Sequence, residues 1–555
     1  MRKRKNDSIK IIPLGGVGEI GKNMYVIEVD DEIFVMDAGL MFPENEMLGI
    51  DIVIPDIRYL EENKDRVKGI FLTHGHEDAL GALTYVLQKV SAPVYGTKLT
   101  VALAKARLKE DAFQDDVKFY TVHSETELFF DGVSVTFFRT THSIPDSVGV
   151  CIHTSEGSIV HTGEFKFDQG AQGLYKPDIG KMAQIGENGV LCLLSDSTEA
   201  ERPGYTTSET VIASEVSDAF HSSKGRIIVS CYASNLIRIQ QVFDAAAANQ
   251  RKVAVVGRSI KRVFEIALQL EYLHVAEGIL IPIEEAKHYQ KEEIVILATG
   301  NQGEPLEALQ KMTKQSHKLV NIEKGDTVFI AATPSPSMEL ILSKTINMLY
   351  RAGANVLTAS RKVHVSGHGS QEDLKMMINL MKPEYFIPIQ GEYRMLRSHA
   401  RLAEETGIPK NRIYLVDKGE IVEYKEKKMR VSGKVPAGNV LIDGLGVGDV
   451  GNIVLRDRKL LSQDGIFIVV VTLNRRNKSM VSGPEIISRG FVYVRESEKL
   501  IEESTALIQD IVERNIAKKS FEWSSIKQEI RDQLNYFLFN KTRRRPMILP
   551  IIMEV

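Results

Sequence analysis

The chain has 555 residues, of which 43% are hydrophobic and 26% charged, and its formal net charge is −3 at pH 7. No apolar run reaches the roughly 20 residues of a membrane-spanning helix, so the composition indicates no membrane span. The small net charge does not indicate a nucleic-acid partner, so any contact with RNA must come from a local positive surface. The chain has three cysteines, a small and odd number that argues against a disulfide framework. We therefore expect a reducing, cytoplasmic location.

A glycine-rich stretch follows the first predicted strand, which covers residues 9–14. Gly16, Gly18 and Gly21 match the dinucleotide fingerprint G-x-G-x-x-G, which requires a helix after the glycines. Residues 24–29 and 32–36 instead predict a β-hairpin, because two β-rich runs are separated by two aspartates. We therefore reject dinucleotide binding here. Asp37 ends the second strand, where a turn carboxylate is the simple interpretation.

Three potential metal ligands follow the next predicted strand. Residues 69–72 form an apolar run, and His74, His76 and Asp78 come after it at alternate positions. Apolar residues at 80, 83, 87 and 90 have helical spacing, so we predict that the ligands lie on a strand-to-helix loop. Two imidazoles and a carboxylate suit zinc or manganese. The alternative is a polar loop whose histidines have no function.

Further candidate ligands stand at the ends of later strands. Strands over 135–141 and 158–163 deliver His142 and Glu164, as a composite metal site requires. Asp196 follows another strand and is either a turn residue or a site carboxylate, which the sequence leaves open. Three other histidines lack this placement and are interpreted as ordinary surface or strand residues: His123, His153 and His161.

From about residue 206 the pattern changes to alternating strands and helices. Strands at 226–230, 252–256, 294–298 and 327–330 predict a parallel, doubly wound sheet with ligand sites at its carboxyl ends. Ser234 and Asn235 suit a helix N-cap, either as a phosphate site or as a cap without a ligand. The glycines near His364 and His368 disfavour a helix, so that loop suits an anion better than a metal.

The last hundred residues predict a small α+β domain. Residues 452–455 are interpreted as a strand, so Gly446, Gly448 and Gly451 mark a turn region at a domain boundary. Strands are expected at 466–473, 491–494 and 547–553, with helices at about 497–518 and 525–540. The uninterrupted apolar strands favour an oligomer interface.

Six segments together resemble the ribonuclease J family over essentially the whole chain: Gly15–Asn23, Asp37–Gly39, the 74–78 loop, Thr141–Ser147, Ser366–Gly369 and Pro550–Val555. The resemblance implies an α/β fold, in which a metallo-β-lactamase αββα sandwich carries a doubly wound β-CASP insert and a small α+β C-terminal domain. We assign residues 1–205 and 366–450 to the sandwich with its linker, 206–365 to the insert, and 451–555 to a C-terminal oligomerisation domain.

The resemblance also implies functional residues. The metal ligands would be His74, His76, Asp78, His142 and Glu164, supported by Asp37. Catalytic roles are implied for Asp78, Asp196 and His368. RNA contacts are implied for Ala233, Ser234, Asn235, His364, Val365, Ser366, Gly367 and His368. The implied cofactor is zinc or manganese, with magnesium as a third option.

The chain departs from the family pattern at Ala79 and Gln390, where the family has histidines, and at Glu164, where it has aspartate. The first metal site keeps a sufficient zinc-type set, whereas the second keeps too few ligands. We therefore expect one ion per chain and weak activity as an exonuclease or endonuclease, because two-metal hydrolysis needs both ions.

Several partners and alternatives follow from the resemblance. The expected partners are RNA with a 5′-monophosphate end, a second copy of the chain, the active paralogue, and an RNA-degradation complex. The expected processes are mRNA turnover and rRNA maturation. One alternative is a non-catalytic RNA-binding subunit. Another is a hydrolase of small molecules, which the long insert and the 364–368 loop disfavour.

Overall fold

The fold is described from a computed structural model that covers residues 8–44, 46–299, 305–331, 339–358, 366–474, 476–477, 479–492, 497–517 and 522–555. The chain divides into two compact units, one of residues 1–41 and 54–439 and one of residues 42–53 and 440–555. Among these described residues, no helix is both long and apolar enough to cross a bilayer.

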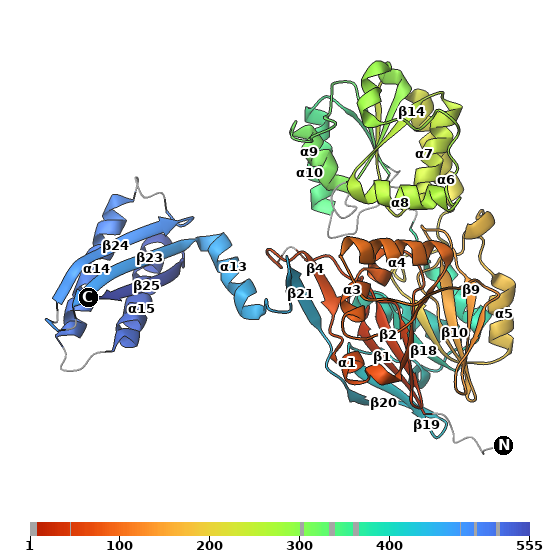
Figure 1. The fold of residues 1–555 in the computed structure, drawn as a ribbon, viewed down its shortest axis with the longest axis horizontal. Coiled ribbons are helices and arrows are strands. Elements are labelled where there is room, and N and C mark those ends of the chain that lie inside the picture. The colour runs from red at the N-terminus through yellow and green to blue at the C-terminus, as the bar shows by residue number, and fades with distance from the viewer. Residues whose placement is uncertain are drawn as a thin grey trace. The chain divides into compact units, whose positions relative to one another are not determined.

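Two sheets form the body of the first unit (Figure 1). Their strand orders are β20-β19-β1-β2-β3-β5-β6-β7 and β18-β12-β11-β10-β9-β8. The strands of the first sheet are β1 Ile9–Gly15, β2 Met24–Val29, β3 Glu32–Met36, β5 Val67–Phe71, β6 Val94–Gly96, β7 Phe119–Thr121, β19 Glu420–Lys425 and β20 Lys428–Lys434. Those of the second are β8 Glu127–Phe129, β9 Ser134–Arg139, β10 Val148–Thr154, β11 Gly157–His161, β12 Val190–Asp196 and β18 Tyr385–Ile389.

Alternation along the strands explains the layers. Ile27 and Phe34 point toward the second sheet and share a core with Phe137. Their neighbours Val26 and Val35 point the other way, into a core that also contains side chains of the helices on the outer face. Those helices include α1 Arg58–Glu62, α2 Glu77–Leu80, α3 Leu83–Leu87 and α4 Lys98–Glu110. On the outer face of the second sheet lie α5 Ile179–Glu187, α11 Gln371–Met381 and α12 Tyr393–Glu405. The predicted αββα sandwich is confirmed.

A separate parallel sheet lies between α5 and α11 in the sequence, with the order β14-β15-β13-β16-β17. Its strands are β13 Ile227–Ser230, β14 Lys252–Val256, β15 Ile294–Ala298, β16 Thr327–Ile330 and β17 Asn355–Thr358. Ile227 and Val229 share a core with α6 Glu209–Ser222, α7 Leu236–Ala248 and α8 Arg258–Gln269. Ile228 packs on the opposite side, with α9 Pro305–Thr313 and α10 Glu339–Arg351. The predicted doubly wound insert is confirmed, and β17 is an additional strand that the sequence interpretation lacked.

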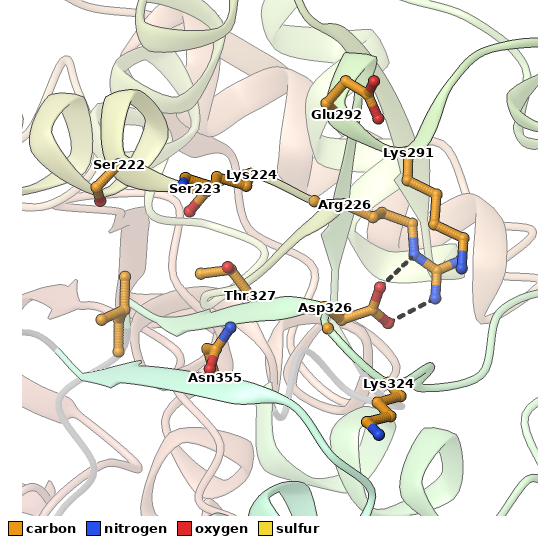
Figure 2. A pocket seen from close by; sticks show the side chains of 13 residues that line it. Ser222, Ser223, Lys224, Arg226, Lys291, Glu292, Lys324, Asp326, Thr327 and Asn355 are labelled. Carbon is orange, nitrogen blue, oxygen red and sulfur yellow. Dashed lines mark hydrogen bonds and ion pairs between the residues drawn. The ribbon is translucent and has the colours of Figure 1, made fainter.

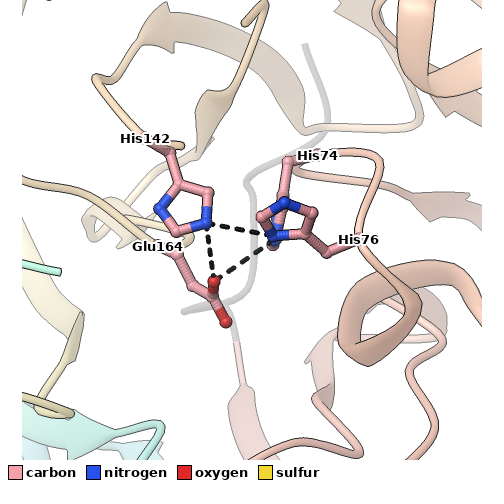
Figure 3. A group of neighbouring side chains, drawn as sticks. All are labelled: His74, His76, His142 and Glu164. Atoms are coloured by element: carbon pink, nitrogen blue, oxygen red, sulfur yellow. Dashed lines mark hydrogen bonds and ion pairs between the residues drawn. The ribbon is translucent and has the colours of Figure 1, made fainter. Parts of the chain in front are cut away.

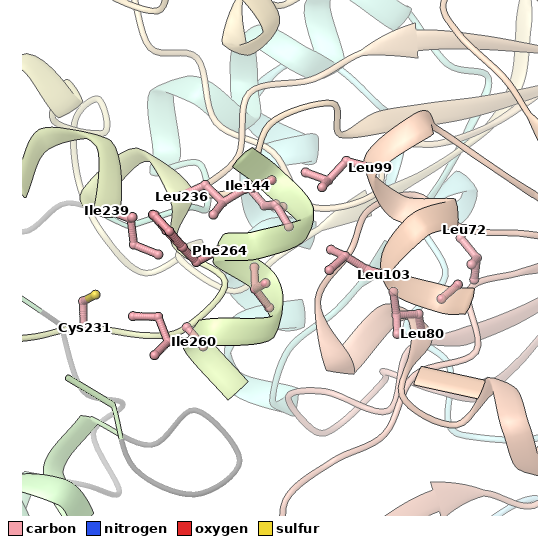
Figure 4. Packing of buried hydrophobic residues seen from close by; sticks show 14 of the residues in the cluster. Leu72, Leu80, Leu99, Leu103, Ile144, Cys231, Leu236, Ile239, Ile260 and Phe264 are labelled. Atoms are coloured by element: carbon pink, nitrogen blue, oxygen red, sulfur yellow. The ribbon is translucent and has the colours of Figure 1, made fainter. Parts of the chain in front are cut away.

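The insert and the sandwich share one hydrophobic core (Figure 4). Leu99 and Leu103 of α4 belong to the same cluster as Ile260 and Phe264 of α8. Helices α4 and α8 contact each other directly. Ile144, in the loop between β9 and β10, is buried in this cluster as well. The insert is therefore packed against the sandwich and is not merely connected to it by its chain ends.

The second unit contains two small sheets, with the strand orders β24-β23-β25 and β22-β21-β4. Phe467, Val469 and Val471 alternate along β23 toward the helices and are fully buried. The elements are β4 Ile52–Pro55, β21 Asn439–Asp443, β22 Gly446–Val447, α13 Asn452–Asp464, β23 Ile466–Asn474, β24 Ser479–Arg489, α14 Glu498–Ile516, α15 Trp523–Thr542 and β25 Met547–Glu554. A small α+β architecture is confirmed.

Some local predictions are wrong. Residues 452–455 open the helix α13, in which no side chain is buried, and a short apolar run cannot distinguish strand from helix. The helix expected after residue 78 is two short helices, and Asp78 lies within α2 instead of on the preceding loop. Phe491 and Val492 are not in a strand, and residues 493–494 lie outside the described part.

Candidate metal centre

Four side chains converge where strands of the two sheets end (Figure 3). His74, His76, His142 and Glu164 each offer one ligand atom, and these atoms all lie within 4.8 Å of one another. His142 Nε2 is 3.1 Å from Glu164 Oε2 and 3.1 Å from His76 Nδ1. His74 Nε2 is 3.3 Å from the same Glu164 oxygen. His74 follows β5, His142 follows β9 and Glu164 follows β11, so the packing of the two sheets brings the four residues together.

Hydrogen bonds outside the cluster fix which ring atoms face inward. The Thr73 hydroxyl lies 3.0 Å from both Asp37 carboxylate oxygens and 2.9 Å from His74 Nδ1. Its single proton goes to the carboxylate, so it accepts from His74 Nδ1–H, and Nε2 faces the cluster. His142 Nδ1 donates to the Gly367 carbonyl at 2.8 Å, which leaves its Nε2 unprotonated. Asp37 therefore reaches the cluster through Thr73.

The donor set fits a divalent cation. Asn23 Nδ2 donates to Glu164 Oε1 at 3.2 Å, which leaves Oε2 to face the imidazoles. Nε2 of His74 is buried, and no described atom makes a hydrogen bond of good geometry to it, although Glu164 Oε2 lies 3.3 Å away. Buried polar atoms without partners are costly and call for an ion or a water. Three imidazoles and one carboxylate complete the four-ligand set that zinc prefers.

The cluster perturbs the acidity of its own members. Burial lowers the pKa of His76 well below its ordinary value, and the charges of His74 and His142 act in the same direction. Burial also lowers the pKa of His74, but Glu164 and Asp78 outweigh it and raise that pKa to about 9. Burial raises the pKa of Glu164, but neighbouring imidazoles, His74 first, outweigh it and hold that pKa well below its usual range. Protons and a cation compete for these nitrogens, so cation binding releases protons.

A histidine–carboxylate pair adjoins the cluster. His368 Nδ1 lies 2.7 Å from Asp196 Oδ2, and its Nε2 lies 3.9 Å from Glu164 Oε2. The backbone amide and hydroxyl of Thr198 both donate to Asp196 Oδ1. Burial lowers the pKa of His368, but Asp196 and Glu164 outweigh it and raise that pKa to about 10. His368 therefore carries a proton at neutral pH, beside the candidate ligands.

The positions expected to bind a second ion are poor in donors. Ala79 is fully buried, and its carbonyl accepts from the Ala38 backbone amide. Gln390 is 2% exposed, and neither atom of its amide has a hydrogen-bond partner among the described residues. Asp78 Oδ1 is also unpartnered there and lies 3.7 Å from His74 Nε2. These positions offer one carboxylate and one neutral amide.

The residues predicted to contact RNA are placed as follows. Ala233 is buried, and Ser234 is half-buried beside it. Asn235 caps α7, because its side-chain oxygen accepts from the Arg238 backbone amide at 3.0 Å. Ser366 Oγ accepts from the His368 amide at 3.1 Å. His364 and Val365 lie outside the described residues.

The sequence interpretation missed Asn23, Thr73 and Thr198, which orient Glu164, His74 and Asp196. Asn23 closes the glycine-rich motif, and Thr73 directly precedes the first histidine. Asn23 and Thr73 act across the chain, on Glu164 and through Asp37, whereas Thr198 acts on Asp196 two residues before it. Proximity to recognised segments was the only signal for the first two.

A cavity of about 530 Å³ lies at the amino ends of β13, β16 and β17 (Figure 2). Arg226 and Asp326 form a two-pronged ion pair at its wall, with distances of 3.1 and 2.6 Å. It contains no predicted site residue. Ligands of doubly wound sheets bind at the carboxyl ends of the strands, so this cavity lies at the wrong edge for such a site.

Family models match four successive segments of this chain. The metallo-beta-lactamase superfamily model matches residues 17–191, and the model of the Zn-dependent metallo-hydrolase RNA specificity domain matches residues 354–415. The Ribonuclease J beta-CASP model matches residues 224–349, and the Ribonuclease J C-terminal model matches residues 453–555. A solved protein of unknown function from Enterococcus faecalis V583 aligns with 75% of this chain and 100% of its own, with a TM-score of 0.54 and 14% identity, which supports the fold alone.

Full-length relatives are much closer. Ribonuclease J 2 of Staphylococcus saprophyticus is 59% identical over 553 residues, covering 100% of this chain and 99% of that protein. Ribonuclease J 2 of Staphylococcus epidermidis and of Staphylococcus aureus are each 58% identical with the same coverage. Similarity of this degree over the whole length, with each domain matched in order, means that the chain belongs to the ribonuclease J family.

Proposed function

We propose that this protein is a metal-dependent ribonuclease of low intrinsic activity that processes and degrades RNA in the cytoplasm. The names of its full-length relatives and the RNA specificity model support a nuclease that acts on RNA. The observation that carries the proposal is the cluster of His74, His76, His142 and Glu164, buried except for the half-buried His76, beside the charged His368. Asp78 and Asp196 complete the proposed catalytic set.

In the proposed cleavage reaction, a bound cation and the side chains of the protein have different roles. A zinc or manganese ion held by the four ligands would supply a Lewis acid for a phosphodiester, and magnesium is a less suitable occupant because it prefers oxygen ligands. His368 keeps its proton through Asp196, so its imidazolium can bind the scissile phosphate or protonate the leaving oxygen. Asn23 holds Glu164 in place, and the Gly367 carbonyl holds His142.

Low activity is proposed because the second ion lacks ligands. Ala79 offers none, and Gln390 offers a neutral amide. In two-metal hydrolysis the ions stabilise both the attacking and the leaving oxygen. If the missing ion contributed roughly 4 kcal/mol of that stabilisation, its loss would slow the reaction about a thousandfold. We therefore propose one ion per chain.

The RNA partner and the oligomer belong to the same proposal. Residues 233–235 and 366–368 are proposed to contact RNA and to prefer a 5′-monophosphate end, together with His364 and Val365. In the second unit, Leu549, Ile551 and Met553 on β25 are 42%, 39% and 47% exposed, on the sheet face opposite the helices. This apolar face supports an oligomer interface within residues 451–555, for a homodimer or for a complex with the active paralogue, within an RNA-degradation assembly.

A second candidate function is a non-catalytic RNA-binding subunit of that complex. The buried Ala79 favours it, because the chain keeps the family architecture while losing a ligand. The proposed domain limits are the same for both functions: 1–205 and 366–450 for the sandwich, 206–365 for the insert, and 451–555 for the C-terminal domain.

The test is degradation of 5′-labelled monophosphate RNA by the isolated protein, titrated with manganese. We expect slow cleavage that rises with manganese and is lost in His142→Ala, which controls for a contaminating nuclease. Binding of RNA without any cleavage, at every manganese concentration, would favour the subunit function. Cleavage that persists unchanged in His142→Ala would refute the proposed centre.

A further inference from the structure

The loops that carry the candidate metal ligands have a common feature that the proposed chemistry does not use. Each is joined by a buried or half-buried polar contact to a residue of the insert. The loops are 74–78, 142–147 and 164–168, and the insert residues are Arg262, Tyr272 and Glu209.

The first contact reaches the loop of His74 and His76. Glu77 lies between His76 and Asp78, and its carboxylate is 3.5 Å from the guanidinium of Arg262 on α8. Arg107 on α4 holds the other oxygen of Glu77 at 3.1 Å. Arg262 also pairs with Glu110 at the end of α4. Arg262 thus joins the insert to both the ligand loop and α4.

The second contact reaches the loop of His142. The Tyr272 hydroxyl donates to Asp146 Oδ2 at 2.7 Å. Asp146 has a positive φ of 65°, which is unfavourable for a residue with a side chain and is kept only where the surroundings fix it. Ile144, in the same loop, packs in the core shared with α4, α7 and α8. A polar and an apolar contact thus hold this loop.

The third contact reaches the strand end that carries Glu164. Lys166, two residues later, is fully buried and lies 2.9 Å from Glu209 Oε1. Arg238 of α7 lies 3.1 Å from the other oxygen of Glu209. The Glu209 backbone amide donates to Asp168 at 2.9 Å. A buried charge triad therefore connects the Glu164 segment to two helices of the insert.

We propose that Arg262, Tyr272 and Glu209 are positioning residues for the metal centre, so that the insert holds all three ligand loops in the geometry that binds a cation. This inference rests on the proposed metal centre. Contacts outside the ligands set ligand orientation, and their loss commonly lowers metal affinity by about 10–100-fold. The insert supplies all three contacts. Removing one contact should loosen only the loop that it holds, and removing several should lower the cation affinity further.

The test measures cation affinity and does not use activity. The full-length protein is freed of metal with a chelator, and zinc binding is measured by competition with a chromophoric chelator. Tyr272→Phe removes one hydroxyl and keeps the ring, and Arg262→Gln removes one charge. The matched controls are Tyr350→Phe, an exposed tyrosine on α10, and Arg258→Gln, an exposed arginine on α8.

We expect each contact variant to bind zinc about tenfold more weakly, the double variant to bind more weakly still, and Arg262→Lys to recover part of the loss. The controls should bind as the parent protein does. Contact variants that bind zinc normally but melt at a lower temperature would show that the contacts are only structural, and would refute the inference while leaving the proposed function intact. A parent protein that binds no zinc or manganese would overturn both.

Discussion

Glu209 is the most informative position for testing how the insert is held. Its carboxylate lies between two buried cations, since the side chains of Lys166 and Arg238 are 0% and 4% exposed. Glu209→Gln removes the negative charge that both cations contact. Removing one member of a buried ion pair costs roughly 3–5 kcal/mol, and we take about 3 because the glutamine carbonyl still accepts one hydrogen bond.

The assay is hydrogen–deuterium exchange of the intact protein, because unfolding of a multidomain chain gives no single free energy. If the free energy of local opening falls by about 3 kcal/mol, amide exchange becomes about a hundredfold faster, provided that the opened segment recloses faster than its amides exchange. We expect this acceleration in α6 and not in α14. Glu187→Gln, in the exposed pair with Lys382, is the control and should change nothing. Unchanged exchange in α6 of Glu209→Gln would refute the claim that the triad stabilises this junction.

Three further predictions concern function. The triple variant Ala79→His, Glu164→Asp, Gln390→His should bind a second ion, which elemental analysis can show. Its cleavage rate should rise by much more than the sum of the increases in the three single variants. A triple variant that binds two ions yet stays inert would place the defect in the RNA channel. RNA with a 5′-monophosphate should bind more tightly than 5′-hydroxyl RNA in filter binding, and equal affinities would contradict a phosphate pocket. A chain ending at residue 450 should be monomeric in light scattering and fail to co-purify with the paralogue, and a truncated chain that still dimerises would place the interface elsewhere.

Short-range patterns were enough for much of the fold. The hairpin of residues 24–29 and 32–36 is observed at the predicted limits, because its β-rich runs and its two-residue turn are local properties. The strands of the insert follow from repeated apolar runs between helices. β24 escaped prediction because Gly483 and Pro484 interrupt it, and both residues normally argue against a strand. In α13, no side chain is buried and Ile453 is exposed, so burial imposes no helical spacing on its apolar residues.

The candidate site was predictable where it consists of ligands at strand ends, and not where it depends on distant contacts. His74, His76 and Glu164 come from recognisable segments, and the structure brings them together. The role of the Gly367 carbonyl in orienting His142 depends on a contact across 225 residues. No local pattern encodes such a contact.

The charge triad has the same limitation. Lys166 follows a predicted ligand by two residues, yet its partner Glu209 lies at the start of a helix of the insert. Sequence alone gives no reason to pair them. The Asp196–His368 pair was reachable only through the family resemblance, since each residue is ambiguous in its own segment.

We propose a single cation centre at His74, His76, His142 and Glu164. The most direct measurement is anomalous scattering from crystals grown with manganese or zinc, combined with elemental analysis of the same preparation. We expect one well-occupied ion per chain, bound by these four side chains, and none beside Ala79 and Gln390. Two well-occupied ions in the parent protein, or a single ion at any other place, would contradict it.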